Sequence, residues 1–234
     1  MLESATRDLV HLSRHLHARG WVANHDGNVS CRLPDGRLLA TPTAVSKAEV
    51  SPEMLVLLDA EGKVVSGTRR VFSEIALHLA VYRARPDVTW VVHAHPPQAT
   101  AWAVAGRTFW ERPFMAEPVV SLGSDIRCVS PGDLPEVIGV SDVVLLRNHG
   151  VLAVGPDAET ARLRLELVEH VAHIAALAVP LGGPVPLGHD EVEALLAARA
   201  RAGLGPAAAG PVAGGSSGSP DAQALVRAAL ERFK

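Results

Sequence analysis

A near-continuous apolar stretch from Val88 to His95 is the feature that most constrains the fold of this chain. A strand that is apolar on both faces is buried on both faces, so it lies inside a sheet that helices cover from each side. Pro86 favours the end of a helix just before this stretch, and Pro97 suits the first turn of the next helix. The stretch therefore predicts a central strand with helices before and after it.

Further helices and strands follow from local patterns along the chain. Helical spacing of apolar residues predicts helices at 2–20, 73–85, 157–178 and 189–202, with Ser73 and Asp157 as N-caps. Short apolar runs predict strands at 29–33, 37–41, 56–59, 63–66, 119–122, 143–146 and 151–154, the first four as two hairpins. Mixed helices and strands of this kind indicate an α/β fold, with helices on both faces of one sheet.

Composition sets the domain organisation and excludes several classes of partner. We expect one domain at 1–202, a flexible linker at 203–220, which is rich in Gly, Ala, Pro and Ser, and a C-terminal helix at 221–234. The net charge of −3 gives no electrostatic reason to bind nucleic acid or an anionic membrane. Two cysteines do not make a disulfide framework, and neither a signal peptide nor a membrane span is recognisable. We therefore expect a soluble cytoplasmic protein that acts on a small molecule.

Three histidines can form a metal site. His93 and His95 end the central strand, and His149 lies beside a glycine between two apolar runs. Side chains at i and i+2 of a strand point to the same face, so His93 and His95 can bind one ion that His149 completes. Three histidines leave coordination positions open for water or substrate, which is typical of a catalytic site. The alternative is that each of the three is an ordinary packed side chain.

Glu74 lies at the start of a predicted helix, directly after Ser73. A carboxylate there interacts favourably with the helix dipole, which is one sufficient explanation. The chemical alternative is a general base, or a fourth metal ligand that substrate displaces. His78 lies one turn later on the same helical face, and we interpret it as a core histidine.

Two turns offer groups that could bind an anion. Gly27 and Asn28 permit left-handed backbone and can aim N–H groups at an anion, and Thr43 adds a hydroxyl at a strand end. All of these are also common turn residues.

Taken together, residues from about 20 to 178 resemble the class II aldolase/adducin family, which includes sugar-phosphate aldolases such as L-fuculose-1-phosphate aldolase. The order and spacing of six motifs carry the resemblance: Asp26-Gly27-Asn28-Val29-Ser30, Thr41-Pro42-Thr43, Ser73-Glu74, Arg85-Pro86-Asp87, His93-Ala94-His95 and Asn148-His149-Gly150. The resemblance implies a three-layer α/β/α domain with a central mixed β-sheet, and a homotetramer with active sites between subunits. It implies Zn²⁺, or another divalent ion, on His93, His95 and His149, with Glu74 as the catalytic residue. It assigns substrate binding to Gly27, Asn28, Thr43 and Ser73.

The function that this resemblance implies is a metal-dependent lyase of the aldolase type. The substrate would be a small hydroxy-ketone or sugar (phosphate), and the reaction would pass through a metal-stabilised enediolate while Glu74 moves the proton. A decarboxylase, epimerase or dehydratase on the same site stays an alternative. So do an Fe(II) oxygenase and a non-enzymatic adducin-like interaction module.

Departures from the family pattern concern the phosphate site and the proton donor. Asp26 and Phe72 stand where small or hydroxylated residues would favour phosphate, and Ala44 replaces a glycine. A carboxylate facing the phosphate would repel it, so we expect weaker phosphate selectivity than in the sugar-phosphate aldolases. Aldolase members use tyrosines as proton donors, whereas the single tyrosine here, Tyr82, falls in the middle of a predicted helix.

Overall fold

The computed structural model describes residues 2–206. Its α-helices are α1 (Leu2–Ala18), α2 (Ile75–Ala84), α3 (Pro97–Val104), α4 (Ala116–Leu122), α5 (Leu134–Val137), α6 (Ala158–Ala178) and α7 (His189–Arg201). Its strands are β1 (Asn28–Arg32), β2 (Leu38–Ala40), β3 (Val56–Leu58), β4 (Val64–Ser66), β5 (Trp90–Ala94), β6 (Cys128–Val129), β7 (Val143–Leu146) and β8 (Gly150–Gly155). The predicted helix at 221–234 and most of the predicted linker at 203–220 lie outside the described residues.

The strands form one mixed sheet in the order β4-β3-β2-β1-β5-β8-β7-β6. Only the β6–β7 pair is parallel among these neighbours. Strand β5 lies between β1 and β8, with Val91 and Val92 fully buried on opposite faces, which confirms the predicted central strand. His93 lies opposite Asn28 of β1 and Leu152 of β8, so the sheet holds its backbone from both sides.

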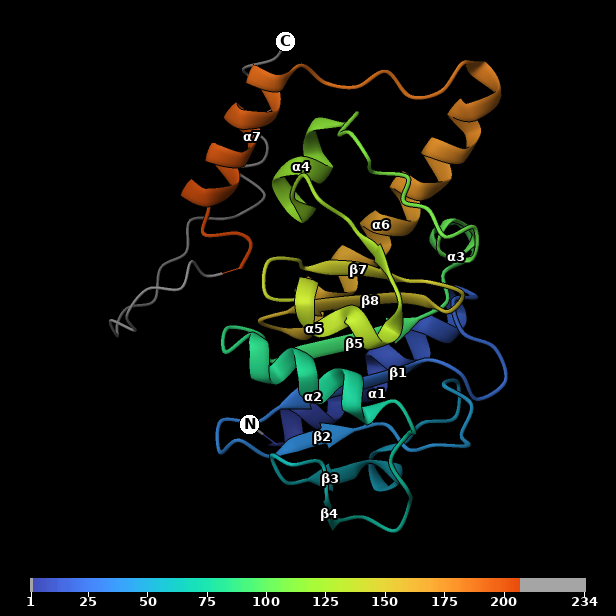
Figure 1. Ribbon diagram of the computed structural model, residues 1–234. Helices are drawn as coiled ribbons and strands as arrows, with labels where there is room; N and C mark the ends of the chain where they lie inside the picture. The colour runs from blue at the N-terminus through green and yellow to red at the C-terminus, as the bar shows by residue number, and fades with distance from the viewer. Residues whose placement is uncertain (1, 207–234) are drawn as a thin grey trace.

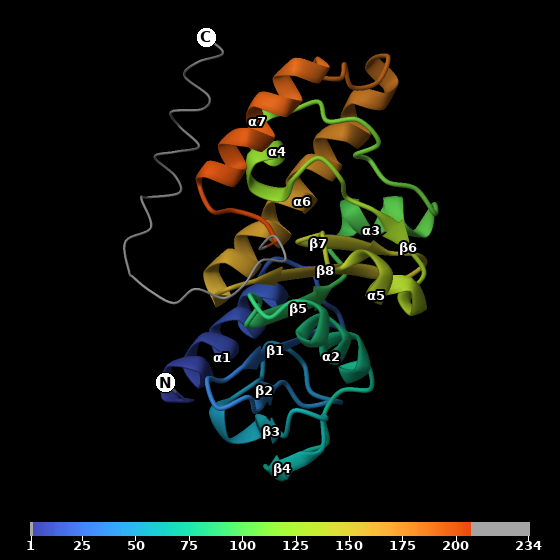
Figure 2. The same ribbon diagram turned by 60° about the vertical axis from the view of Figure 1, so that its left-hand side comes forward.

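Helices cover both faces of the sheet, as Figures 1 and 2 show. Apolar residues of α1, α3 and α6 share one core with one face, and those of α2 and α5 share a second core with the other face. Helix α4 packs against α6 and α7 beyond the edge of the sheet (Figure 1). This is the expected α/β architecture. Among residues 2–206, none of the helices combines the length and the apolar character that a membrane span requires.

Most predicted elements are present within one to three residues of their expected limits, but two predictions are wrong. Residues 119–122 belong to helix α4 instead of a strand. A run of four residues cannot reveal its period, and here Val119, Val120 and Leu122 are buried against neighbouring helices. Ser73 is not the N-cap of α2, because the helix begins one residue later and Glu74 takes that position. Asp157 does cap α6, since its side chain accepts a hydrogen bond from the Thr160 backbone N–H.

A buried carboxylate joins distant parts of the fold. Asp142 precedes β7, and its fully buried side chain pairs with three arginines, which we call the Asp142 cluster: Arg85 at 3.0 Å, Arg164 at 2.8 Å, and Arg199. Arg85 also pairs with Asp87 at 2.7 Å. The cluster therefore ties the α2–β5 connection, α6 and α7 to the start of β7, and it gives the Arg85-Pro86-Asp87 motif a structural role.

Candidate metal centre

The three predicted histidines meet at one point beside the end of the central strand. The Nε2 atom of His93 lies 3.1 Å from that of His95 and 2.9 Å from that of His149. His149 reaches this point because Asn148 turns the chain between β7 and β8 with a left-handed backbone, φ 55°. The fold thus brings together residues separated by 56 positions in the chain.

Hydrogen bonds at the other ring nitrogen fix how His93 and His95 face this point. His93 Nδ1 lies 2.9 Å from the Val151 carbonyl oxygen, and His95 Nδ1 lies 2.9 Å from a carboxylate oxygen of Asp26. Both oxygens can only accept, so Nδ1 carries the proton and the Nε2 lone pair faces the centre. Burial lowers the pKa of His93 to about 4, which keeps its imidazole neutral and available as a ligand.

The distances fit a divalent ion. Two Zn–N bonds of about 2.1 Å hold their nitrogens about 3.0 Å apart at a right angle and about 3.4 Å apart at the tetrahedral angle. The observed Nε2 separations of 2.9 and 3.1 Å are close to this range, and the three ligand atoms lie within 4.8 Å of one another. Lone pairs that converge this closely repel one another unless a cation, or a proton on one of the nitrogens, lies between them. The donor set therefore suits zinc, and it admits other divalent ions that bind imidazole.

Glu74 borders the same point from the start of α2. Its Oε1 lies 2.7 Å from His149 Nε2, its Oε2 lies 3.6 Å from His93 Nε2, and the amide of Asn28 donates to Oε2 at 2.8 Å. The hydrogen bond with His149 lowers the pKa of Glu74 to about 2, against the opposing effect of its burial. The carboxylate is therefore ionised at neutral pH, and it is near enough to act either as a base or as a further ligand.

Asp26 has a role that the sequence did not reveal. Its Oδ1 accepts a hydrogen bond from the Ala23 backbone N–H, and its Oδ2 bonds His95 as described above. The carboxylate thus orients His95 in the way that outer carboxylates usually orient histidines at metal sites. Both carboxylate oxygens are directed to protein groups, and the expectation that Asp26 weakens phosphate selectivity stays a prediction.

Gly27 and Asn28 follow Asp26 in the same turn. Gly27 has a φ of +68°, and a Cβ there would lie 2.3 Å from Val22 Cγ1, so this position requires glycine. Asn28 is buried and directs its amide to Glu74. It therefore holds the carboxylate in place, and its predicted contact with substrate stays a prediction.

The other predicted substrate-binding residues lie on neighbouring loops. The backbone N–H of Thr43 donates to the Arg70 carbonyl at 2.9 Å, so the Thr43 loop is tied to the segment that leads to Ser73. Ser73 is exposed beside Glu74. Phe72, in contrast, is buried and packs its ring against His78, with centroids 4.8 Å apart. It therefore does not add bulk at the surface of the site.

His78 and Tyr82 lie among polar groups between β1 and α2. Ser30 Oγ lies 2.7 Å from His78 Nδ1 and 2.8 Å from the Tyr82 hydroxyl, and both rings are buried. His78 is thus a core residue, as expected. Burial raises the pKa of Tyr82 well above its usual range, and its hydroxyl is bonded inside the core. Tyr82 is therefore not placed to donate a proton to a substrate.

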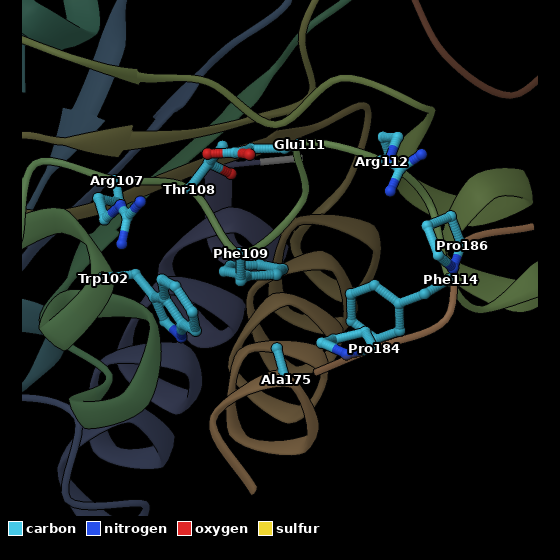
Figure 3. A pocket seen from close by; sticks show the side chains of 10 residues that line it. All are labelled: Trp102, Arg107, Thr108, Phe109, Glu111, Arg112, Phe114, Ala175, Pro184 and Pro186. Carbon is cyan, nitrogen blue, oxygen red and sulfur yellow. The ribbon is translucent and has the colours of Figure 1, made fainter. Parts of the chain in front are cut away.

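A separate pocket of about 240 Å³ lies where α3 and α6 meet the segments before α4 and α7 (Figure 3). Three aromatic residues, Trp102, Phe109 and Phe114, contribute to its walls, and Arg107 and Arg112 lie at opposite ends of it (Figure 3). None of the three histidines lines it. The segment 112–117 contributes Phe114 to this pocket, and its side chain has no acidic proton.

Comparison with known proteins agrees with this geometry. The family model for the class II aldolase and adducin N-terminal domain matches residues 7–176. A 5-deoxy-D-ribulose 1-phosphate aldolase from Bacillus thuringiensis is 29% identical over 83% of this chain and 95% of its own length. A 3-oxo-tetronate 4-phosphate decarboxylase from Haemophilus influenzae is 32% identical over 74% and 88%. The crystal structure of YgbL from Klebsiella pneumoniae, a candidate aldolase, epimerase or decarboxylase, superposes with a TM-score of 0.76 at 27% identity, over 83% of this chain and 99% of that one.

Proposed function

Because the chain belongs to the class II aldolase and adducin family, we propose that it is a metal-dependent lyase that breaks a carbon–carbon bond next to a carbonyl group. The observation that carries the proposal is the convergence of three imidazole nitrogens with an ionised carboxylate at 2.7 Å from one of them. An interaction module would have no use for this arrangement. A divalent ion, for which we propose zinc, would supply Lewis-acid polarisation of the substrate carbonyl.

The residues around the ion have separate tasks in this proposal. His93, His95 and His149 hold the ion, and Asp26 and the Val151 carbonyl keep two of the rings oriented. Glu74 is the general base, since it is ionised and its carboxylate lies beside the ligands. It removes a proton from the substrate and returns it to carbon after the bond breaks.

We propose a small hydroxy-ketone or sugar phosphate as substrate, bound between the turn at Gly27 and the loops of Thr43 and Ser73. The structure supports this only by bringing these segments next to Glu74 through the Asn28 and Thr43 contacts. The relatives named above act on phosphorylated sugars or sugar acids. We further propose a cytoplasmic homotetramer, which light scattering of the purified protein would test.

A decarboxylase is the second candidate, and the buried Tyr82 favours it. In aldol cleavage, the hydroxyl on the departing carbon loses a proton and the carbon left behind gains one, so Glu74 has to serve both positions unless a second acid–base group shares the task. In decarboxylation, an ionised carboxylate departs as CO₂ without losing a proton, so the one proton transfer left is delivery of a proton from solvent, through Glu74, to the carbon left behind. The one tyrosine of the 234 residues lies in the core, so it cannot supply that second group.

The proposal is tested by metal content and by Glu74→Gln. The purified chain should carry about one divalent ion, and replacing any of the three histidines with alanine should remove it. Glu74→Gln should fold normally and lose about 10²–10⁴-fold in kcat towards 5-deoxyribulose 1-phosphate or 3-oxo-tetronate 4-phosphate, because the amide cannot accept the proton. Release of CO₂ or of an aldehyde distinguishes the two candidates. A chain that neither carries nor binds a divalent ion would contradict the proposal.

A further inference from the structure

Lys47 is buried, with 1% of the residue exposed, although its side chain carries an ammonium group. Its Nζ donates to the carbonyl oxygens of His25 at 3.2 Å and Val45 at 3.1 Å. Burial lowers the pKa of Lys47, and the negative charge of Asp26 opposes that shift. Removing an ammonium group from water costs free energy that an apolar side chain of the same length would not cost. A lysine at this buried position therefore indicates a role beyond filling space.

The two carbonyls belong to two loops with unusual backbone. The 23–28 loop contains Asn24 and Gly27 in the left-handed region, and the loop before Lys47 contains Ala44 at φ 56°. Left-handed backbone is costly for residues other than glycine, so other contacts must hold such loops in place. The Lys47 ammonium group is a contact that joins them directly.

The position of the His25 carbonyl matters because it belongs to the peptide bond that leads into Asp26. The carboxylate of Asp26 holds His95, and two residues later the amide of Asn28 holds Glu74. A shift of this single peptide would therefore move a partner of a metal ligand and a partner of the base together.

We propose that Lys47 is a positioning residue for the metal centre. Its ammonium group ties the 23–28 loop to the loop that contains Ala44 and Val45, and so it fixes Asp26 against His95. The inference rests on the proposed function, since it assumes that His95 is a ligand. Without the ammonium group, the His25 carbonyl oxygen loses its hydrogen-bond donor. The 23–28 loop can then shift, and Asp26 no longer fixes the orientation of the His95 ring.

The test measures zinc affinity of the full chain by competition with a chromophoric chelator, which does not depend on turnover. Lys47→Met keeps the length of the side chain and removes its charge and donors. We expect the zinc dissociation constant to rise by about 10- to 100-fold, the effect of losing an outer contact of a metal ligand. Val50→Ala is the matched control: Val50 is fully buried three residues away, so its truncation lowers stability and should leave zinc affinity unchanged.

A double-mutant cycle with Asp26→Asn shows whether Lys47 acts through Asp26. If it does, the Asp26→Asn chain already has the weaker affinity, and adding Lys47→Met should change it by less than about twofold. Additive effects, or wild-type affinity in Lys47→Met, would overturn the inference while leaving the proposed function intact. A wild-type chain that does not bind zinc would instead overturn the proposed function. If Lys47→Met does not fold, Lys47→Gln replaces it in the same cycle and is judged by the same coupling.

Discussion

Gly150 begins β8 directly after His149, and a methyl group at this position would collide with the metal centre. A Cβ on Gly150 would lie 2.4 Å from His95 Cδ2, 2.6 Å from the Ala94 carbonyl oxygen and 3.2 Å from His93 Cε1. Ala94 is paired with Val151 inside the sheet, so its carbonyl cannot withdraw. The strain of Gly150→Ala must therefore be relieved by the His95 ring or by the turn that carries His149.

The size of the effect follows from these contacts. Carbon atoms in contact normally lie about 3.5–4.0 Å apart, so the His95 ring would have to move by about 1 Å. Metal–ligand distances tolerate only about 0.2 Å. We expect Gly150→Ala to weaken zinc binding by at least about 10- to 100-fold, the range that outer contacts alone produce. We also expect the free energy of unfolding of the metal-free protein to fall by about 1–3 kcal/mol, as for other groups inserted into a packed interior.

Chelator competition measures the zinc affinity, and urea unfolding of the metal-free protein measures the stability. Gly155→Ala is the control, because Gly155 lies at the other end of β8 from the three histidines. A Cβ there would lie 2.7 Å from the Ala161 backbone nitrogen. It should lose stability and keep its zinc affinity. Wild-type zinc affinity in Gly150→Ala would refute the reasoning, as would an equal loss of affinity in both variants.

The remaining predictions concern three buried groups, those of Asp142, Tyr82 and Cys31. Asp142→Asn should lower the free energy of unfolding in urea by about 3–5 kcal/mol, because it removes the carboxylate that pairs with the buried Arg164 and Arg199, whereas Asp125→Asn, in an exposed ion pair, should change it little. Tyr82→Phe should keep kcat near the wild-type value and cost about 1 kcal/mol of stability from the lost hydrogen bond, and a large fall in kcat would make Tyr82 the acid after all. Burial raises the pKa of Cys31 from 9.0 to about 12, so iodoacetamide at pH 9 should label it only after unfolding. Since the unfolded thiol ionises first, this group's contribution to stability should fall as the pH rises from 9 towards 12.

The sequence predicts the elements whose signal is local. The apolar stretch at 88–95 predicts a central strand, and its period of two places His93 and His95 on one side. Helix α4 could not be predicted, because its few apolar residues show no period and its helical state depends on packing against α6 and α7. Partners that come from distant parts of the chain are equally hidden: the contact between Asp26 and His95 spans 69 positions and depends on a left-handed turn.

The candidate site has two parts, one held in place by the sheet and the other by the 23–28 loop. His93 is held by β1, β5 and β8 in the middle of the sheet, and its Nδ1 partner, the Val151 carbonyl, belongs to β8 itself. His95 and Glu74 depend instead on side chains of the 23–28 loop, namely Asp26 and Asn28. Substitutions in that loop should therefore disturb metal affinity and the base together while the sheet stays folded. Under the proposed function, the loop and the buried lysine that ties it down would therefore couple ion binding to proton transfer.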